Sequence, residues 1–172
     1  MKNFIIDVRW PSCAGKSTLV DNFLKTQKWI MHIDPDKLKW FFNDYLDDKS
    51  KYRSILWNML LSLVEDASKN WIPVIFEWRD SIDIEKLEDI AKKYSINLYR
   101  INVEADYSIL LPRFKERIKS VKAEGRVIGN MKEEGLKYRY ENYLQKKRPW
   151  LELNSWELSE EQMLKELVEY IK

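Results

Sequence analysis

The sequence of 172 residues is poor in the residues that build covalent or metal-held frameworks. Cys13 is the only cysteine, which excludes a disulfide framework and a metal site made of several cysteines. His32 is the only histidine, and we interpret it as a packing residue. No apolar run approaches membrane length, and the N-terminus lacks the layout of a signal peptide. These absences favour a cytoplasmic protein in a reducing compartment, without membrane contact.

Glycine is also scarce, with 4 residues where average usage predicts about 12, whereas tryptophan occurs 8 times. Apolar residues make up 45% and aromatic residues 13% of the chain, which predicts one packed domain over residues 1–172. The net charge is only +2, but residues 113–148 contain 12 Lys and Arg against 5 Asp and Glu. That block is either a solvated helical face or a basic lid over a polyanion.

The most informative motif is RWPSCAGKST, which lies between an apolar run and a helical pattern. A strand, a tight loop and a helix form the context of a phosphate-binding loop, where backbone N–H groups face phosphate oxygens. We expect Lys16 to reach β- and γ-phosphates, and the Ser17 hydroxyl to bind Mg²⁺. The predicted nucleotide-binding residues are Pro11, Ser12, Cys13, Ala14, Gly15, Lys16, Ser17 and Thr18.

One position departs from the phosphate-loop consensus GxxxxGK[ST]. Trp10 stands where the first glycine belongs, and glycine reaches backbone angles there that tryptophan adopts only with strain. A chance Gly-Lys-Ser in a turn is the alternative interpretation. The flanking strand and helix favour the functional one.

The rest of the chain alternates between short β-type runs and helical patterns, which predicts an α/β domain with a parallel sheet. Asp7 interrupts the first strand, and a buried carboxylate there is costly unless it is paired. The expected strands are residues 2–9, 29–33, 71–77, 97–103 and 151–153. The expected helices are residues 17–26, a segment capped by Asp34 that continues to Tyr45, and residues 52–68, 84–94, 107–122, 131–147 and 159–171.

Charged residues follow the second and third predicted strands, at the carboxyl edge of the sheet. Asp36 could accept or orient the proton of an acceptor hydroxyl, while Asp34 could do the same or only cap a helix. Lys39 could hold a phosphate or carboxylate of the acceptor, or be surface charge. Glu77 could hold Mg²⁺ through water, contact the acceptor, or simply begin a turn.

Arg113 and Arg117 lie one turn apart in the sequence LPRFKERIKS. Two guanidinium groups at that spacing could neutralise a transferring phosphoryl group. Arg126 lies further on, in a segment flanked by glycines, and could contact the acceptor. An ordinary amphipathic helix with arginines facing outward is the alternative.

Together, the sequences GKST, IDPDK, VIFE and RxxxR resemble the small P-loop kinases, over nearly the whole chain. The resemblance is greatest to the group that includes phage polynucleotide 5′-kinase, zeta toxins and chloramphenicol phosphotransferase. It implies a five-stranded parallel sheet of order 2-3-1-4-5, a helical lid over about residues 113–148, and the use of ATP with Mg²⁺. By similarity, Lys16 and Ser17 bind nucleotide and metal, Asp36 is the acceptor-side base, and Arg113 or Arg117 is the lid arginine.

The resemblance leads us to expect an ATP-dependent kinase that acts on a hydroxyl or phosphate of a small metabolite or nucleoside-type acceptor. Two alternatives stay open. A polynucleotide 5′-hydroxyl could be the acceptor, although Lys39 replaces the arginine of polynucleotide kinases and lacks its bidentate fork. Alternatively, Trp10 could have left a nucleotide-binding module with impaired catalysis.

Three tryptophans stand where this resemblance leads us to expect glycine. They are Trp10 at the start of the phosphate loop, and Trp71 and Trp78 at the turns on either side of the third strand, with Trp29 as a weaker fourth case. Tryptophan at the glycine of a phosphate loop has no physical benefit. We therefore hypothesise that some of these codons are UGA, read as glycine by the source organism.

Overall fold

A single sheet of five parallel strands organises the computed structural model, which describes residues 3–9, 11–42, 44–45, 49–78, 84–123, 132–146 and 150–172. The strand order is β2-β3-β1-β4-β5, which confirms the order implied by the resemblance. The strands are β1 (Phe4–Arg9), β2 (Met31–Ile33), β3 (Val74–Trp78), β4 (Asn97–Glu104) and β5 (Leu151–Asn154).

The helices follow the expected pattern closely. They are α1 (Lys16–Thr26), α2 (Pro35–Leu38), the 3₁₀ turn η1 (Lys39–Phe41), α3 (Lys49–Lys69), α4 (Ile84–Lys93), α5 (Tyr107–Ala123), α6 (Glu133–Lys146) and α7 (Glu160–Tyr170). Within the described ranges, no helix is both long enough and apolar enough to cross a membrane.

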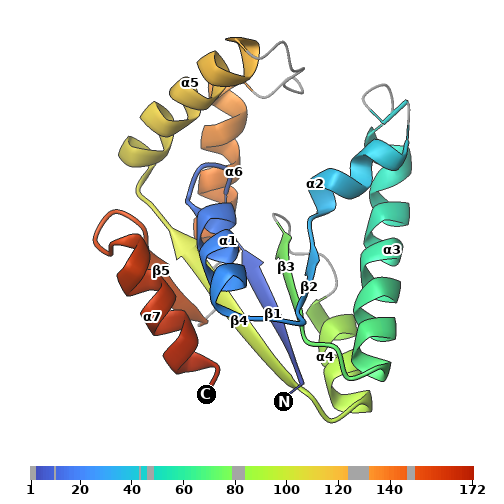
Figure 1. Cartoon of the computed structure of the whole chain (residues 1–172). Coiled ribbons are helices and arrows are strands. Elements are labelled where there is room, and N and C mark those ends of the chain that lie inside the picture. The colour runs from blue at the N-terminus through green and yellow to red at the C-terminus, as the bar shows by residue number, and fades with distance from the viewer. Residues whose placement is uncertain are drawn as a thin grey trace.

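Side chains of the central strand alternate between two apolar cores. Ile6 and Val8 of β1 pack with residues of α1 and α7, whereas Ile5 packs with residues of α3 and α4 on the other face. Figure 1 shows these helix pairs against the sheet, and beyond the carboxyl ends of the strands it shows α5 and α6 on one side and α2 and α3 on the other. The carboxyl edge of the sheet therefore lies between two helical walls.

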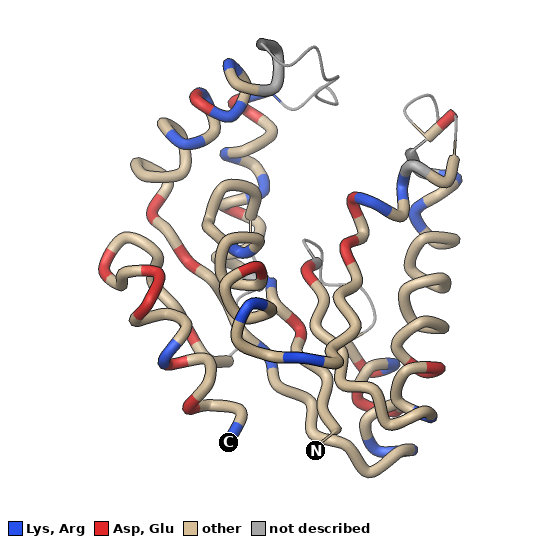
Figure 2. The backbone as a smooth tube through the Cα atoms, viewed as in Figure 1, with Lys and Arg blue, Asp and Glu red and all other residues tan. Residues whose placement is uncertain are grey.

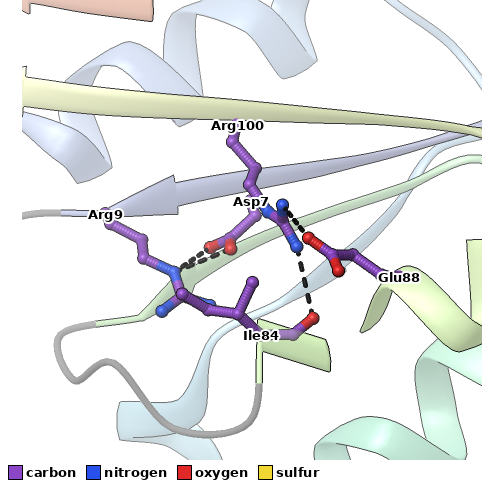
Figure 3. A network of polar contacts seen from close by, with 5 residues as sticks. All are labelled: Asp7, Arg9, Ile84, Glu88 and Arg100. Atoms are coloured by element: carbon purple, nitrogen blue, oxygen red, sulfur yellow. Dashed lines mark hydrogen bonds and ion pairs between the residues drawn. The ribbon is translucent and has the colours of Figure 1, made fainter. Parts of the chain in front are cut away.

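The buried carboxylate of Asp7 is paired, which resolves the irregularity in the first strand. Arg9 lies two residues along β1 on the same face, and its Nε donates to both Asp7 carboxylate oxygens at 2.7 Å. Arg100 lies opposite Asp7 on β4 and pairs with Glu88 at 2.7 Å (Figure 3). Trp150 lies 5.3 Å from each guanidinium. The ion pair offsets the desolvation of Asp7, so we assign the carboxylate a structural role.

The structure corrects two predictions about helices: where the helix capped by Asp34 ends, and which side chains α3 buries. The segment capped by Asp34 was expected to stay helical to Tyr45, but α2 ends at Leu38, η1 ends at Phe41, and Phe42 has extended backbone angles. In α3, Ile55 is 42% exposed although it was expected in the apolar face, whereas Trp57 is buried at 3%. The burial of Trp57 against the sheet makes it a core residue of this fold.

Candidate functional site

The phosphate-binding motif forms the loop between β1 and α1. Its backbone enters the left-handed region at Cys13 (φ 74°) and Gly15 (φ 98°), and the Ala14 N–H donates to the carbonyl of Pro11 at 3.4 Å. Helix α1 begins at Lys16, and no side chain caps its first turn. The N–H groups of that turn are therefore available to an anion, as a phosphate-binding loop requires. Trp10 lies outside the described residues.

Lys16 and Ser17, the residues of this loop expected to bind phosphate and metal, contact different partners. The Lys16 ammonium group lies over its own loop and donates to the Pro11 carbonyl at 3.3 Å. The Ser17 hydroxyl points away, toward the end of β3, where it donates to Glu77 Oε2 at 2.8 Å. Ser17 and Glu77, both expected at a metal site, are thus brought into direct contact.

Glu77 also contacts His32, which the sequence analysis had assigned to packing. Nε2 of His32 lies 3.5 Å from Glu77 Oε1. Burial acts to raise the pKa of Glu77, but the contacts with His32 and Ser17 and the charge of Lys16 outweigh burial and lower it. Glu77 is therefore a carboxylate at neutral pH. A carboxylate beside a hydroxyl is an oxygen donor set of the kind that Mg²⁺ prefers, so these residues fit the ion.

The two aspartates after β2 have separate roles in the structure. Asp34 is the N-cap of α2, and its Oδ1 accepts a hydrogen bond from the Asp36 N–H at 2.9 Å. The side chain of Asp36 is 72% exposed and forms an ion pair with Lys39. The capping function therefore belongs to Asp34, whereas the carboxylate of Asp36 lines the cleft in its ion pair with Lys39.

Arg113 joins helix α5 to two loops. Its Nη1 donates to the Ser155 hydroxyl at 2.9 Å and to the Cys13 carbonyl at 3.5 Å, while Nη2 donates to the Ser155 carbonyl at 3.1 Å. Arg113 thereby connects the phosphate-binding loop to the turn after β5. Arg117, one helical turn further on, also reaches the cleft. Arg126 lies outside the described residues.

Apart from Pro11, Ala14 and His32, the residues described above line one cleft of about 1010 Å³ at the carboxyl edge of the sheet. Its lining comprises Ser12, Cys13, Gly15, Lys16, Ser17, Thr18, Asp34, Pro35, Asp36, Lys39, Tyr45, Arg53, Leu56, Glu77, Arg113, Arg117, Ser155, Leu158, Ser159, Glu160 and Met163. The phosphate loop forms the middle, and the α2–α3 wall and the α5 and α7 segments form the two sides. The cleft is large enough for a nucleotide and a second substrate.

The sequence analysis missed several lining residues. Ser155 follows the fifth strand, so the edge rule that selected Asp36 and Glu77 could also have selected it. Tyr45 and Arg53 gave no such signal, because their contribution depends on how α3 packs beside α2.

Ion pairs partly neutralise the described residues of the basic block 113–148. Lys115 pairs with Glu133 at 3.3 Å, Lys119 with Glu116 at 3.7 Å, and Lys137 with Glu141 at 3.9 Å. Figure 2 shows both signs of charge along α5 and α6. These ion pairs favour the solvated helical face over a continuous polyanion-binding surface.

Comparison with known families identifies the family of the chain. The zeta toxin family profile matches residues 11–148, which is most of the chain, and the chain therefore belongs to the zeta toxin family. The matched range includes the phosphate loop, Asp36, Glu77 and the helices α5 and α6. No curated protein is detectably similar in sequence.

Solved structures share the fold across its whole length. A candidate kinase from Chloroflexus aurantiacus has a TM-score of 0.72 at 16% identity, with 100% of both chains covered. A sugar kinase from Janibacter has a TM-score of 0.67 at 8% identity, with 99% of this chain and 94% of that chain covered. The Pnkp1/Rnl/Hen1 RNA repair complex contains a similar chain, with a TM-score of 0.65 at 17% identity; the alignment covers 87% of this chain and 47% of that chain. At these identities the likeness shows a P-loop kinase-like fold alone.

Proposed function

We propose that this member of the zeta toxin family is an ATP-dependent kinase that transfers the γ-phosphoryl group to a small metabolite or nucleoside-type acceptor. One observation carries the proposal. A single cleft contains Lys16 and Ser17 of the phosphate loop, Glu77 at the end of β3, and the Asp36–Lys39 pair on the facing wall. A donor site and an acceptor site thus open into the same space.

On the donor side, the first turn of α1 would hold the phosphates of ATP through its N–H groups. Lys16 would leave the Pro11 carbonyl and neutralise charge on the β- and γ-phosphates. Ser17 and Glu77 would hold Mg²⁺, directly and through water. When bound, this ion would neutralise phosphate charge. Arg117 would face the phosphates from the lid, and Arg113 would fix the loop that supports them.

On the acceptor side, Asp36 would take the proton of the acceptor hydroxyl. The acceptor oxygen then forms a bond to the γ-phosphorus while the bond to the bridging oxygen breaks, and ADP leaves with that electron pair. An acceptor that presents a phosphate oxygen has no proton to lose, and Asp36 would then orient it. Lys39 holds the Asp36 carboxylate in place through their ion pair.

A phosphorylation screen against a metabolite library with radiolabelled ATP and Mg²⁺ tests the proposal. Transfer of label to an acceptor by the wild-type protein, and its loss in Lys16→Ala, is the expected result. Equal labelling by the Lys16→Ala variant would overturn the assignment of the site.

The same assay separates two other functions. Labelling of oligonucleotide 5′-hydroxyls, with steep salt dependence, would identify a polynucleotide kinase, since phosphate contacts release counterions. Binding of Mg-ATP without hydrolysis or transfer would identify a nucleotide-binding module. The ion pairs of the lid and the intact Ser17–Glu77 contact support the small-molecule kinase instead.

A further inference from the structure

Two exposed tryptophans have left-handed backbone. Trp29, in the loop between α1 and β2, has φ 64°, and Trp71, after α3, has φ 58°. Their side chains are 80% and 70% exposed, and among the described residues neither of them belongs to an apolar core. The left-handed region favours glycine, because a Cβ there comes too close to the following carbonyl oxygen. For a side chain as large as an indole, this conformation is rare.

The backbone around Trp71 forms a Schellman motif at the end of α3. The Trp71 N–H donates to the Ser68 carbonyl at 3.2 Å, and the Ile72 N–H donates to the Ala67 carbonyl at 2.9 Å. These two bonds satisfy carbonyls of the last helical turn, and they place Trp71 at the left-handed position of the motif. Glycine usually occupies that position. The hydrogen bonds therefore favour glycine at position 71 without any appeal to the resemblance.

The same motif recurs after α4 and offers a comparison within the chain. The Ser95 N–H donates to the Lys92 carbonyl at 3.2 Å, and the Ile96 N–H donates to the Ala91 carbonyl at 2.9 Å. Ser95 holds the left-handed position, with φ 53°. Replacing Ser95 with glycine would therefore measure what glycine contributes in this motif, against which a change at Trp71 can be compared.

Both tryptophans lie at the amino edge of the sheet, opposite the cleft. Trp29 precedes β2 and Trp71 precedes β3. Met31 pairs with Val74 at the start of these parallel strands, and the Met31 N–H donates to the Pro73 carbonyl at 2.9 Å. The cleft lies at the carboxyl edge, so the site described above gives no reason for an indole at either position.

Two other tryptophans have the packing that an indole normally provides. Trp57 lies in the interior of α3, is 3% exposed, and belongs to the core on one face of the sheet. The ring of Trp150 lies 5.3 Å from the guanidinium groups of both Arg9 and Arg100. The fold therefore uses these two indoles, in contrast to those of Trp29 and Trp71.

We infer that the natural residue at positions 29 and 71 is glycine, encoded by UGA codons that the source organism reads as glycine. The printed tryptophans then result from translating UGA as tryptophan. Such codons also account for the composition, with 4 glycines against 8 tryptophans in 172 residues. Backbone conformation and exposure support the assignment, so it is independent of the proposed function.

The gene sequence and the native protein test this inference directly. We expect UGA at codons 29 and 71, UGG at codons 57 and 150, and glycine at positions 29 and 71 in peptides of the native protein by tandem mass spectrometry. UGG at codons 29 and 71, or tryptophan in those peptides, would overturn it. UGA at codon 57 would also overturn it, because glycine cannot fill the core volume of the indole and UGA would then encode tryptophan.

Thermal unfolding of recombinant protein with the printed sequence tests the conformational cost. Trp29→Gly and Trp71→Gly should each raise the melting temperature by about 2–4 °C, and Ser95→Gly should raise it by a similar amount. Trp71→Ala is the matched control, since it removes the indole but keeps the Cβ, and it should change the melting temperature little. A lower or unchanged melting temperature in Trp71→Gly, or an equal rise in Trp71→Ala, would contradict the preference for glycine.

Glycine at position 10, which lies outside the described residues, would complete the consensus GxxxxGK[ST] with Gly15, Lys16 and Ser17. This extension rests on the proposed function. In titrations with Mg²⁺ and a non-hydrolysable ATP analogue, Trp10→Gly should bind roughly 10- to 100-fold more tightly than the printed sequence. Unchanged or weaker binding, or UGG at codon 10, would overturn the assignment at position 10. Absence of binding by both proteins would instead count against the kinase, so the two failures are distinguishable.

Discussion

Ser17 and Glu77 are far apart in the sequence, yet the Ser17 hydroxyl donates to Glu77 Oε2 at 2.8 Å. The contact follows from strand pairing. Glu77 lies opposite Val8 in the parallel register of β1 and β3, so it ends beside the loop that leads from β1 into α1. A hydroxyl from the helix start and a carboxylate from the neighbouring strand therefore meet at the position where the phosphates of ATP would lie.

Glu77→Gln should weaken the affinity for Mg-ATP by roughly 10- to 100-fold, because it removes a charged partner of the metal site. Affinity for ATP in EDTA should change little. Titration of nucleotide with and without Mg²⁺ measures this difference, and an equal loss in both conditions would contradict a metal-linked role.

The lowered pKa of Glu77 also predicts a pH dependence of stability. A carboxyl whose folded pKa lies below its unfolded value stabilises the protein above the unfolded pKa, and this contribution is lost as pH falls through the folded pKa. The wild type should therefore be more stable than Glu77→Gln at pH 7, with the difference vanishing in acid. Urea unfolding of both proteins between pH 7 and pH 3 measures it. A difference that persists at pH 3 would contradict the assignment.

Lys16→Ala should abolish phosphotransfer and leave the fold intact. The side chain donates to the Pro11 carbonyl of its own loop, and it is not part of either apolar core. Thermal unfolding and the phosphorylation assay, run on the same preparation, measure the two effects separately. Turnover at the wild-type level would show that the phosphate site lies elsewhere.

Asp36→Asn should lower turnover by about 10²- to 10⁴-fold with little change in ATP affinity, since asparagine cannot accept the acceptor proton. Asp34→Ala is the contrasting variant, because Asp34 caps α2. Loss of that cap should lower stability by about 1 kcal/mol. If Asp36→Asn retains full turnover while its stability falls, Asp36 is only structural.

Arg113 and Ser155 should behave as one unit. Arg113→Lys loses the paired hydrogen bonds to the Ser155 hydroxyl and carbonyl, and Ser155→Ala removes one of the same bonds. In a double-mutant cycle on ATP affinity, the two effects should be non-additive by about 0.5–3 kcal/mol. Arg117→Lys, combined with Ser155→Ala, supplies the comparison pair. Additive effects for Arg113 and Ser155 would show that their contact does not support nucleotide binding.

Much of the scaffold could be predicted because its signals are local. Apolar runs located β1, β3 and β4, and helical periodicity located α1, α3, α4 and α7 within a few residues of their observed bounds. The edge rule for parallel sheets placed the phosphate loop, Asp36 and Glu77 together before any contact was known. The strand order could be predicted only through the resemblance to P-loop kinases, because local patterns do not define which strands are neighbours.

By itself, the sequence determined most of the secondary structure, the phosphate loop and the acidic residues that follow the strands, since each depends on residues near one another in the chain. Tertiary structure decided the pairing of side chains. It joined Ser17 to Glu77 and Arg113 to Ser155, and it buried Asp7 together with Arg9. The direction of a side chain depends on where its helix ends and which element packs beside it. Residues such as Arg53 therefore reach the cleft only through packing that no local pattern encodes.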